Sequence, residues 1–154
     1  MIAIAAMFTA GIAGCGGSSS TASSASLSDF KSAFISDREQ FRQLGRELGH
    51  AIITARLHSN AQLATEFKAF AERANQQAAR VANLNPPAKF HATVNQLRTD
   101  FKAVAADLKR IAAAARQGDA QAARAATRKL LDDASHVKAA DIAVSDALNI
   151  SMRS

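Results

Sequence analysis

Two short motifs in this sequence have the residue types and spacing of metal ligands. Glu47-Leu48-Gly49-His50 has the Glu-x-x-His spacing that places a carboxylate and an imidazole on one face of a helix, as in di-iron carboxylate proteins. Asp133-Ala134-Ser135-His136 is a near match. Such a centre also needs glutamates from the other helices, and the sequence after residue 87 contains none. We therefore predict no metal site and expect the histidines to be solvated.

The sequence lacks the residues that other cofactors and catalytic mechanisms need. With only one cysteine, Cys15, the chain has neither a Cys-x-x-Cys-His haem motif nor a disulfide framework. A zinc site would require three or four of the dispersed histidines to converge. The chain also contains no glycine-rich phosphate loop and no Gly-x-Ser-x-Gly motif. We expect no cofactor and no catalysis.

Two aspartates, Asp37 and Asp141, interrupt an otherwise apolar helical pattern at positions that an antiparallel bundle brings into one layer. Two carboxylates facing an apolar interior repel each other and lose hydration, so one pKa rises unless Arg38, Arg80 or Lys138 reaches them. The layer is either a salt-bridged polar layer that fixes helix register, or a site that senses a small cation or protons. The third alternative is that the last helix frays.

A basic stripe runs along one side of the segment 87–116. Its four members, which fall within about 40° on a helical wheel, are Arg98, Lys102, Lys109 and Arg116. One interpretation is a solvated face, or one paired with the acids of the following helix. The other is attraction to anionic lipid headgroups or to an acidic protein partner. The formal net charge of +6 agrees with either.

The elements that carry these residues are four amphipathic helices, because apolar residues recur at alternating steps of four and three from Leu27 onward. Capping residues and breakers predict helices over about 27–56, 60–83, 87–116 and 119–148, with a frayed tail at 151–154. The short connections predict an all-α fold: an antiparallel up-down-up-down four-helix bundle, left-handed.

The clearest core stripe belongs to the third helix, where Leu97, Phe101, Val104 and Leu108 should be fully buried. The fourth helix should bury Ala123, Thr127, Leu130, Ala134, Val137, Asp141, Val144 and Leu148. The chain has eight Phe but neither Trp nor Tyr, which disfavours the stacking platforms that bind sugars or bases.

The N-terminal residues have the pattern of a targeting signal. An uncharged apolar run ends in Ile12-Ala13-Gly14-Cys15, and a Gly/Ser-rich stretch follows to residue 26. This arrangement resembles the lipobox of bacterial lipoproteins. The resemblance implies that 1–14 is a signal peptide, that Cys15 receives a diacylglycerol and becomes the lipidated first residue, and that 15–26 is a flexible tether.

These features together predict a lipid-anchored helical module on the extracytoplasmic face of a bacterial cell membrane, binding or interacting without catalysis. The membrane is its partner through Cys15, and this location excludes nucleic acid as a partner. Two alternatives remain open: a ligand or ion sensor that uses the layer of Asp37 and Asp141, and an envelope scaffolding or stress-response protein that contacts another membrane protein.

Overall fold

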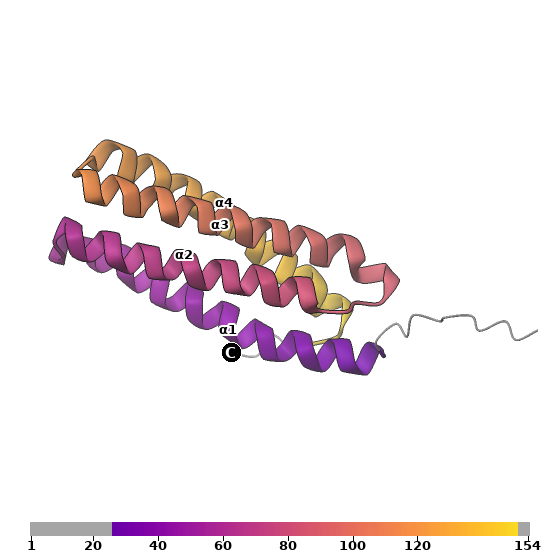
Figure 1. Cartoon of the computed structure of the whole chain (residues 1–154). Helices are drawn as coiled ribbons and strands as arrows, with labels where there is room; N and C mark the ends of the chain where they lie inside the picture. The colour runs from indigo at the N-terminus through magenta and orange to yellow at the C-terminus, as the bar shows by residue number, and fades with distance from the viewer. Residues whose placement is uncertain (1–25, 151–154) are drawn as a thin grey trace, which may run out of the picture.

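The computed structural model describes residues 26–150, and within that range it contains four long helices and no strand. They are α1 (Leu27–Thr54), α2 (Asn60–Asn83), α3 (His91–Gln117) and α4 (Ala120–Ala147), with short 3-10 turns at Ala55–Leu57 and Ala88–Phe90. Successive helices run in opposite directions along one common axis (Figure 1). This confirms the predicted antiparallel four-helix bundle. No helix within residues 26–150 combines the length and apolar character needed to cross a bilayer.

Side-chain caps start three of the helices. The Ser26 hydroxyl accepts a hydrogen bond from the Asp29 backbone N–H, and a reciprocal capping box joins Ser59 and Gln62 at the start of α2. The Asp119 carboxylate accepts hydrogen bonds from two backbone N–H groups in the first turn of α4. Each cap satisfies backbone donors that have no partner inside the helix.

Two breakers end the middle helices. Gly118 adopts a left-handed φ of 69° directly after α3, a conformation that a residue without a Cβ tolerates. Pro86 and Pro87 follow the end of α2. The first turn after them winds as a 3-10 helix, so α3 begins at His91 and not at residue 87 as the sequence suggested. Short 3-10 segments of this kind are common at helix N-termini.

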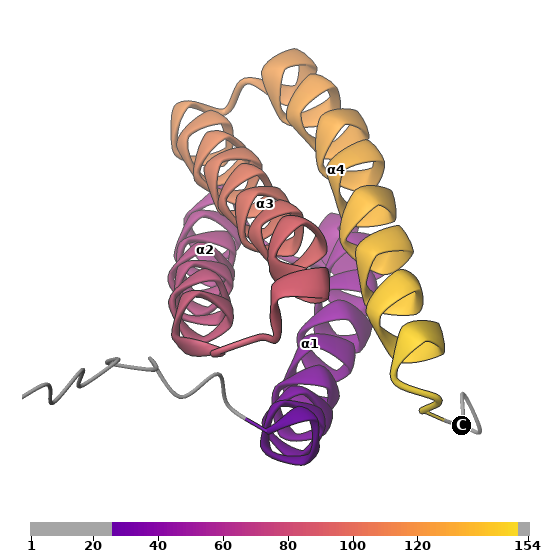
Figure 2. The same ribbon diagram turned by 90° about the vertical axis from the view of Figure 1, so that its right-hand side faces the viewer.

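The helices are not equally close to one another. Looking along the bundle, Figure 2 shows them in a ring in chain order. The closest pair is α2 and α3, followed by α3 and α4, whereas α1 and α4 keep their backbones apart along almost their whole length. Small side chains such as Ala71, Ala74, Ala105 and Ala112 form much of the tight α2–α3 contact and let the backbones approach.

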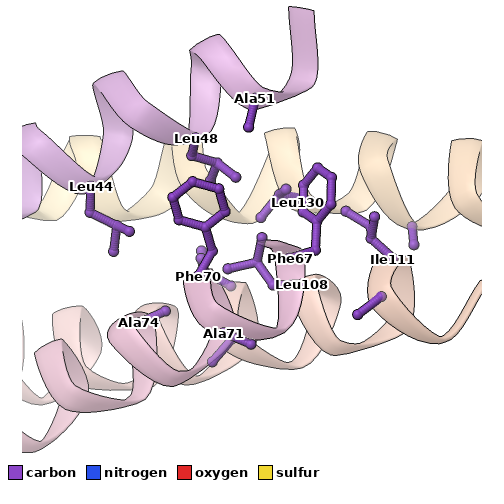
Figure 3. Close-up of a cluster of buried hydrophobic side chains, with 14 residues drawn as sticks. Leu44, Leu48, Ala51, Phe67, Phe70, Ala71, Ala74, Leu108, Ile111 and Leu130 are labelled. Atoms are coloured by element: carbon purple, nitrogen blue, oxygen red, sulfur yellow. The ribbon is translucent and has the colours of Figure 1, made fainter. Parts of the chain in front are cut away.

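Large side chains hold α1 farther from its neighbours. In the half of the core near the N-terminus of α1, the ring centroid of Phe30 lies 5.1 Å from that of Phe90. The ring centroid of Phe41 lies 4.7 Å from that of Phe101. In the other half, Leu44 and Leu48 point into a cluster built from all four helices (Figure 3). Bulky residues fill the core at a larger interaxial distance.

The predicted stripe of α3 is confirmed, since Leu97, Phe101, Val104 and Leu108 are all buried. The stripe predicted for α4 is wrong in part. Ala123, Thr127, Ala134, Val137 and Asp141 are only half-buried. In their place α4 buries Ala126, Asp133, Ala140 and Ser145. The helix is rotated toward α3, because its close partner is α3 and its other side borders the gap beside α1.

Candidate functional site

A groove of about 610 Å³ opens between α1 and α4. It exists because α1 and α4 stand apart, and because Gly45 contributes no side chain to fill the space. A Cβ added at Gly45 would meet no atom within 4 Å. The apolar floor comes from three helices and consists of Phe41, Leu44, Leu48, Phe101, Val104 and Val137. The groove is therefore a preformed hollow with an apolar base.

Charged side chains surround the mouth of this groove. Arg38 and Arg42 come from α1, and Lys138 and Asp141 come from α4. Three positive charges against one negative charge make the rim cationic. Within residues 26–150 neither Arg42 nor Lys138 forms an ion pair. The rim can thus accept an anionic group without breaking an existing pair of either residue.

Asp141 lies at one end of the groove and binds Arg38. The Arg38 Nε donates to both carboxylate oxygens of Asp141, at 3.0 and 3.1 Å. The two side chains are only 11% and 16% exposed, so this pair is largely removed from water. Farther toward the chain ends, Lys31 Nζ donates to the carbonyl of Leu148 at 2.9 Å. These contacts hold α1 and α4 together at that end of the groove.

Asp37, the residue before Arg38, faces α2 instead. Its carboxylate lies 3.9 Å from the Arg80 guanidinium, and its side chain is 12% exposed whereas that of Arg80 is 52% exposed. Burial raises the pKa of Asp37 above the usual 3.8, and the charge of Arg80 opposes that rise. The ion pair between Asp37 and Arg80 is weaker than that between Asp141 and Arg38, because it is longer and half of it is in water.

The structure therefore places each predicted aspartate opposite its own arginine, one on the α2 side of α1 and one on the α4 side. Arg38 and Arg80 were two of the three cations that sequence reasoning considered, and Lys138 stays at the rim of the groove. This arrangement favours the salt-bridged polar layer. It ties α1 to both of its neighbours at one level along the bundle and so sets the register of α1.

Sequence reasoning missed a second acidic pair, which lies between α3 and α4. Asp107 is completely buried and Asp133 nearly so. Burial, and then a hydrogen bond with Asp133, raise the pKa of Asp107. Burial also acts to raise the pKa of Asp133, but hydrogen bonds with Lys129 and Asp107 bring it below the usual value. Lys129 Nζ donates to both Asp133 oxygens at 3.0 Å.

Because the pKa of Asp107 is raised and that of Asp133 is lowered, Asp107 is the carboxyl of the pair that keeps its proton to the higher pH. Oδ1 of Asp107 accepts a hydrogen bond from Arg110, whereas Oδ2 is buried and has no hydrogen-bond partner within the described residues. The sequence feature that could have revealed this pair is the seven-residue spacing of Ala126, Asp133 and Ala140. Asp133 falls midway between Ala126 and Ala140 on α4, and those three residues form the side that packs on α3.

The basic stripe lies on the side of α3 away from α4. Arg98 is half-exposed, and Lys102, Lys109 and Arg116 are exposed. Arg116 borders a shallow hollow with Ala61, Ala64, Thr65 and Lys68 of α2, so the stripe belongs to the α2/α3 face. Within residues 26–150 none of the four forms an ion pair. Pairing of the stripe with acids of α4 is therefore absent within residues 26–150. Figure 2 shows that α1 and α4 lie on the side of the bundle opposite to α2 and α3, so the groove between α1 and α4 is on the other face.

The motifs with metal-ligand spacing do not converge. Glu47 binds Arg73 of α2, and His50 and His136 are exposed. Asp133 is buried, but the groups that it contacts are Asp107 and Lys129, not a histidine cluster. In the part of the chain that the structure describes, no three His, Cys, Asp or Glu side chains are grouped to hold a metal ion. Cys15 and most of the predicted tether lie outside the described residues.

Comparison with known proteins yields no match: no family model, no curated protein and no solved structure is significantly similar to this chain.

Proposed function

We propose that this protein is a lipid-anchored interaction module on the extracytoplasmic face of a bacterial cell membrane, and that it binds without catalysing a reaction. The anchor is the lipidated Cys15 of the lipobox resemblance. The described residues form a helical body, and its α2/α3 face carries the basic stripe of Arg98, Lys102, Lys109 and Arg116. This face contacts anionic lipid headgroups next to the anchor.

The observation that carries this proposal is the state of the four basic side chains. They lie along one helix at the surface, and no carboxylate within residues 26–150 neutralises them. Each basic residue near an anionic membrane contributes about 1 kcal/mol of attraction. A short tether keeps the body close to the bilayer, so this modest attraction acts at a high effective concentration.

The test uses the full chain with Cys15→Ala, so that any vesicle binding comes from the protein surface. Replacing Arg98, Lys102 and Lys109 with Gln should weaken binding to vesicles of phosphatidylglycerol and phosphatidylcholine by roughly a hundredfold at low salt. The difference should shrink as salt screens the charges. Co-sedimentation with the vesicles measures both effects.

A matched control removes three exposed basic residues from α4, which borders the opposite face: Arg124, Arg128 and Lys138, each changed to Gln. Both triple variants lose the same formal charge. If they weaken vesicle binding equally, only net charge matters and the α2/α3 face has no special role. If the stripe variant binds as the unchanged chain does, the stripe does not contact lipid, and an acidic protein becomes the partner to seek.

A further inference from the structure

We propose that the α1/α4 groove binds a free fatty acid, with the acyl chain on the apolar floor and the carboxylate between Arg42 and Lys138. This ligand site goes beyond the proposed membrane contact, since it lies on the opposite face of the bundle and uses different residues.

The floor has the chemistry of an acyl-chain site. Aromatic and branched aliphatic side chains from α1, α3 and α4 line it, and they include Phe41, Leu48, Phe101 and Val104. Its volume of about 610 Å³ lies within the roughly 300 to 1,000 Å³ typical of small-molecule sites. The polar side chains that line the groove all belong to the rim, so the floor offers no hydrogen bond to a polar ligand. A flexible hydrocarbon chain matches this surface.

The rim selects an anion. Arg38 is held by Asp141, so those two charges offset each other. Arg42 and Lys138 stand on the two opposite walls, and no carboxylate within residues 26–150 pairs with either. A carboxylate placed between them can bind both at once through charge-assisted hydrogen bonds. A neutral lipid or an apolar peptide would leave these two cations without a partner.

Gly45 keeps the groove open. A glycine inside a helix weakens the helix relative to alanine, yet this one sits in the middle of α1 and forms part of the groove wall. Any larger side chain at this position would project into the open space. Gly49, one turn later, has equally open surroundings, but it does not line the groove. The two glycines therefore provide a matched pair for substitution.

The ligand class is tested by calorimetric titration of the full chain, carrying Cys15→Ala and stripped of lipid, with octanoate, decanoate and laurate. Affinity should rise roughly fourfold for each added methylene until the floor is covered. Dodecanol should bind at least tenfold more weakly than laurate. Arg42→Gln combined with Lys138→Gln should abolish that preference for the carboxylate. Equal affinity for laurate and dodecanol in the unchanged chain would overturn the proposal, as would tighter binding of a single-chain anionic phospholipid than of laurate.

The location is tested by Gly45→Leu, with Gly49→Leu as its control. Both changes improve helix propensity, so both proteins should melt at or above the temperature of the unchanged chain. Laurate affinity should fall at least tenfold in Gly45→Leu and stay within twofold in Gly49→Leu. Equal affinity in all three proteins would place the ligand elsewhere and refute the assignment. Equal loss in both variants would do the same, because the effect would then belong to α1 generally. Vesicle binding through the basic stripe should not change in either variant, so failure of one proposal does not imply failure of the other.

Discussion

Asp37 and Asp141 should respond in opposite directions to the same chemical change. Asp141→Asn replaces a carboxylate that accepts two hydrogen bonds from Arg38, in a pair that is 11% and 16% exposed. The asparagine can still accept one hydrogen bond, but it no longer offsets the charge of Arg38. Removing the charge of one partner in such a largely buried pair should cost about 2 kcal/mol at pH 7.

Asp37→Asn should be neutral or should stabilise the protein by up to about 1 kcal/mol at pH 7. Burial raises the pKa of Asp37 above 3.8, and Arg80 compensates only in part. The folded state therefore keeps this proton to a higher pH than the unfolded chain does. Ionisation of Asp37 costs stability above the folded-state pKa, and that cost disappears below about 3.8. The advantage of Asp37→Asn should fade over the same range of pH.

Urea denaturation of the full chain carrying Cys15→Ala, followed by far-UV circular dichroism, measures these changes in the free energy of unfolding. A loss of about 2 kcal/mol should also lower the melting temperature by about 8 °C for a domain of this size. Asp146→Asn, an exposed acid on α4, is the control and should change stability by less than about 0.5 kcal/mol. If Asp37→Asn destabilised the protein as much as Asp141→Asn does, the assignment of a costly carboxylate and a stabilising one would be wrong.

Three further predictions concern other parts of the chain. Phe101→Ala should cost about 3 to 5 kcal/mol in urea denaturation, because the ring is buried and packs on Phe41, and a loss below about 1 kcal/mol would contradict this packing. Asp107→Asn should stabilise the protein at pH 7 and not below pH 3.8, since burial and Asp133 raise the pKa of Asp107 and ionisation therefore costs stability; a loss at pH 7 would show that the carboxylate form is required. In the bacterial host, Cys15→Ala should move the protein out of the membrane fraction, and equal recovery with membranes would refute the anchor.

The helices and the core of α3 could be predicted from the sequence because their signals are local. Ser59 with Gln62, Gly118 and Asp119 act within one or two turns of the chain, and each forms the cap or stop that its residue type predicts. The α3 stripe is unambiguous because a large apolar residue recurs every three or four positions from Val94 to Ile111. Local chemistry therefore determined both the architecture and the clearest core positions.

The rotation of α4 could not be predicted in the same way. Alanine is its commonest residue, and aspartates lie on two of its sides, so both the side of Val137 and Asp141 and the side of Asp133 and Ala140 have the character of a core face. Which face of α4 is buried depends on how closely α3 approaches α4. That distance is set by the packing of the two helices and not by the local sequence. The same uncertainty concealed the pair of Asp107 and Asp133. It also concealed the groove, which requires α1 and α4 to stand apart.

The uneven spacing of the helices has a consequence for the order of folding. The close contacts join α2 to α3 and α3 to α4, which are neighbours along the chain with short connections, so this three-helix unit has the low contact order that favours rapid folding. By comparison, α1 is held to α4 by side chains more than 100 positions apart in sequence, as the pair of Arg38 and Asp141 illustrates. Such contacts form only after α4 is in place. Because α1 supplies one wall of the groove, any molecule bound in the groove shifts the equilibrium between detached and docked α1 toward the fully docked bundle.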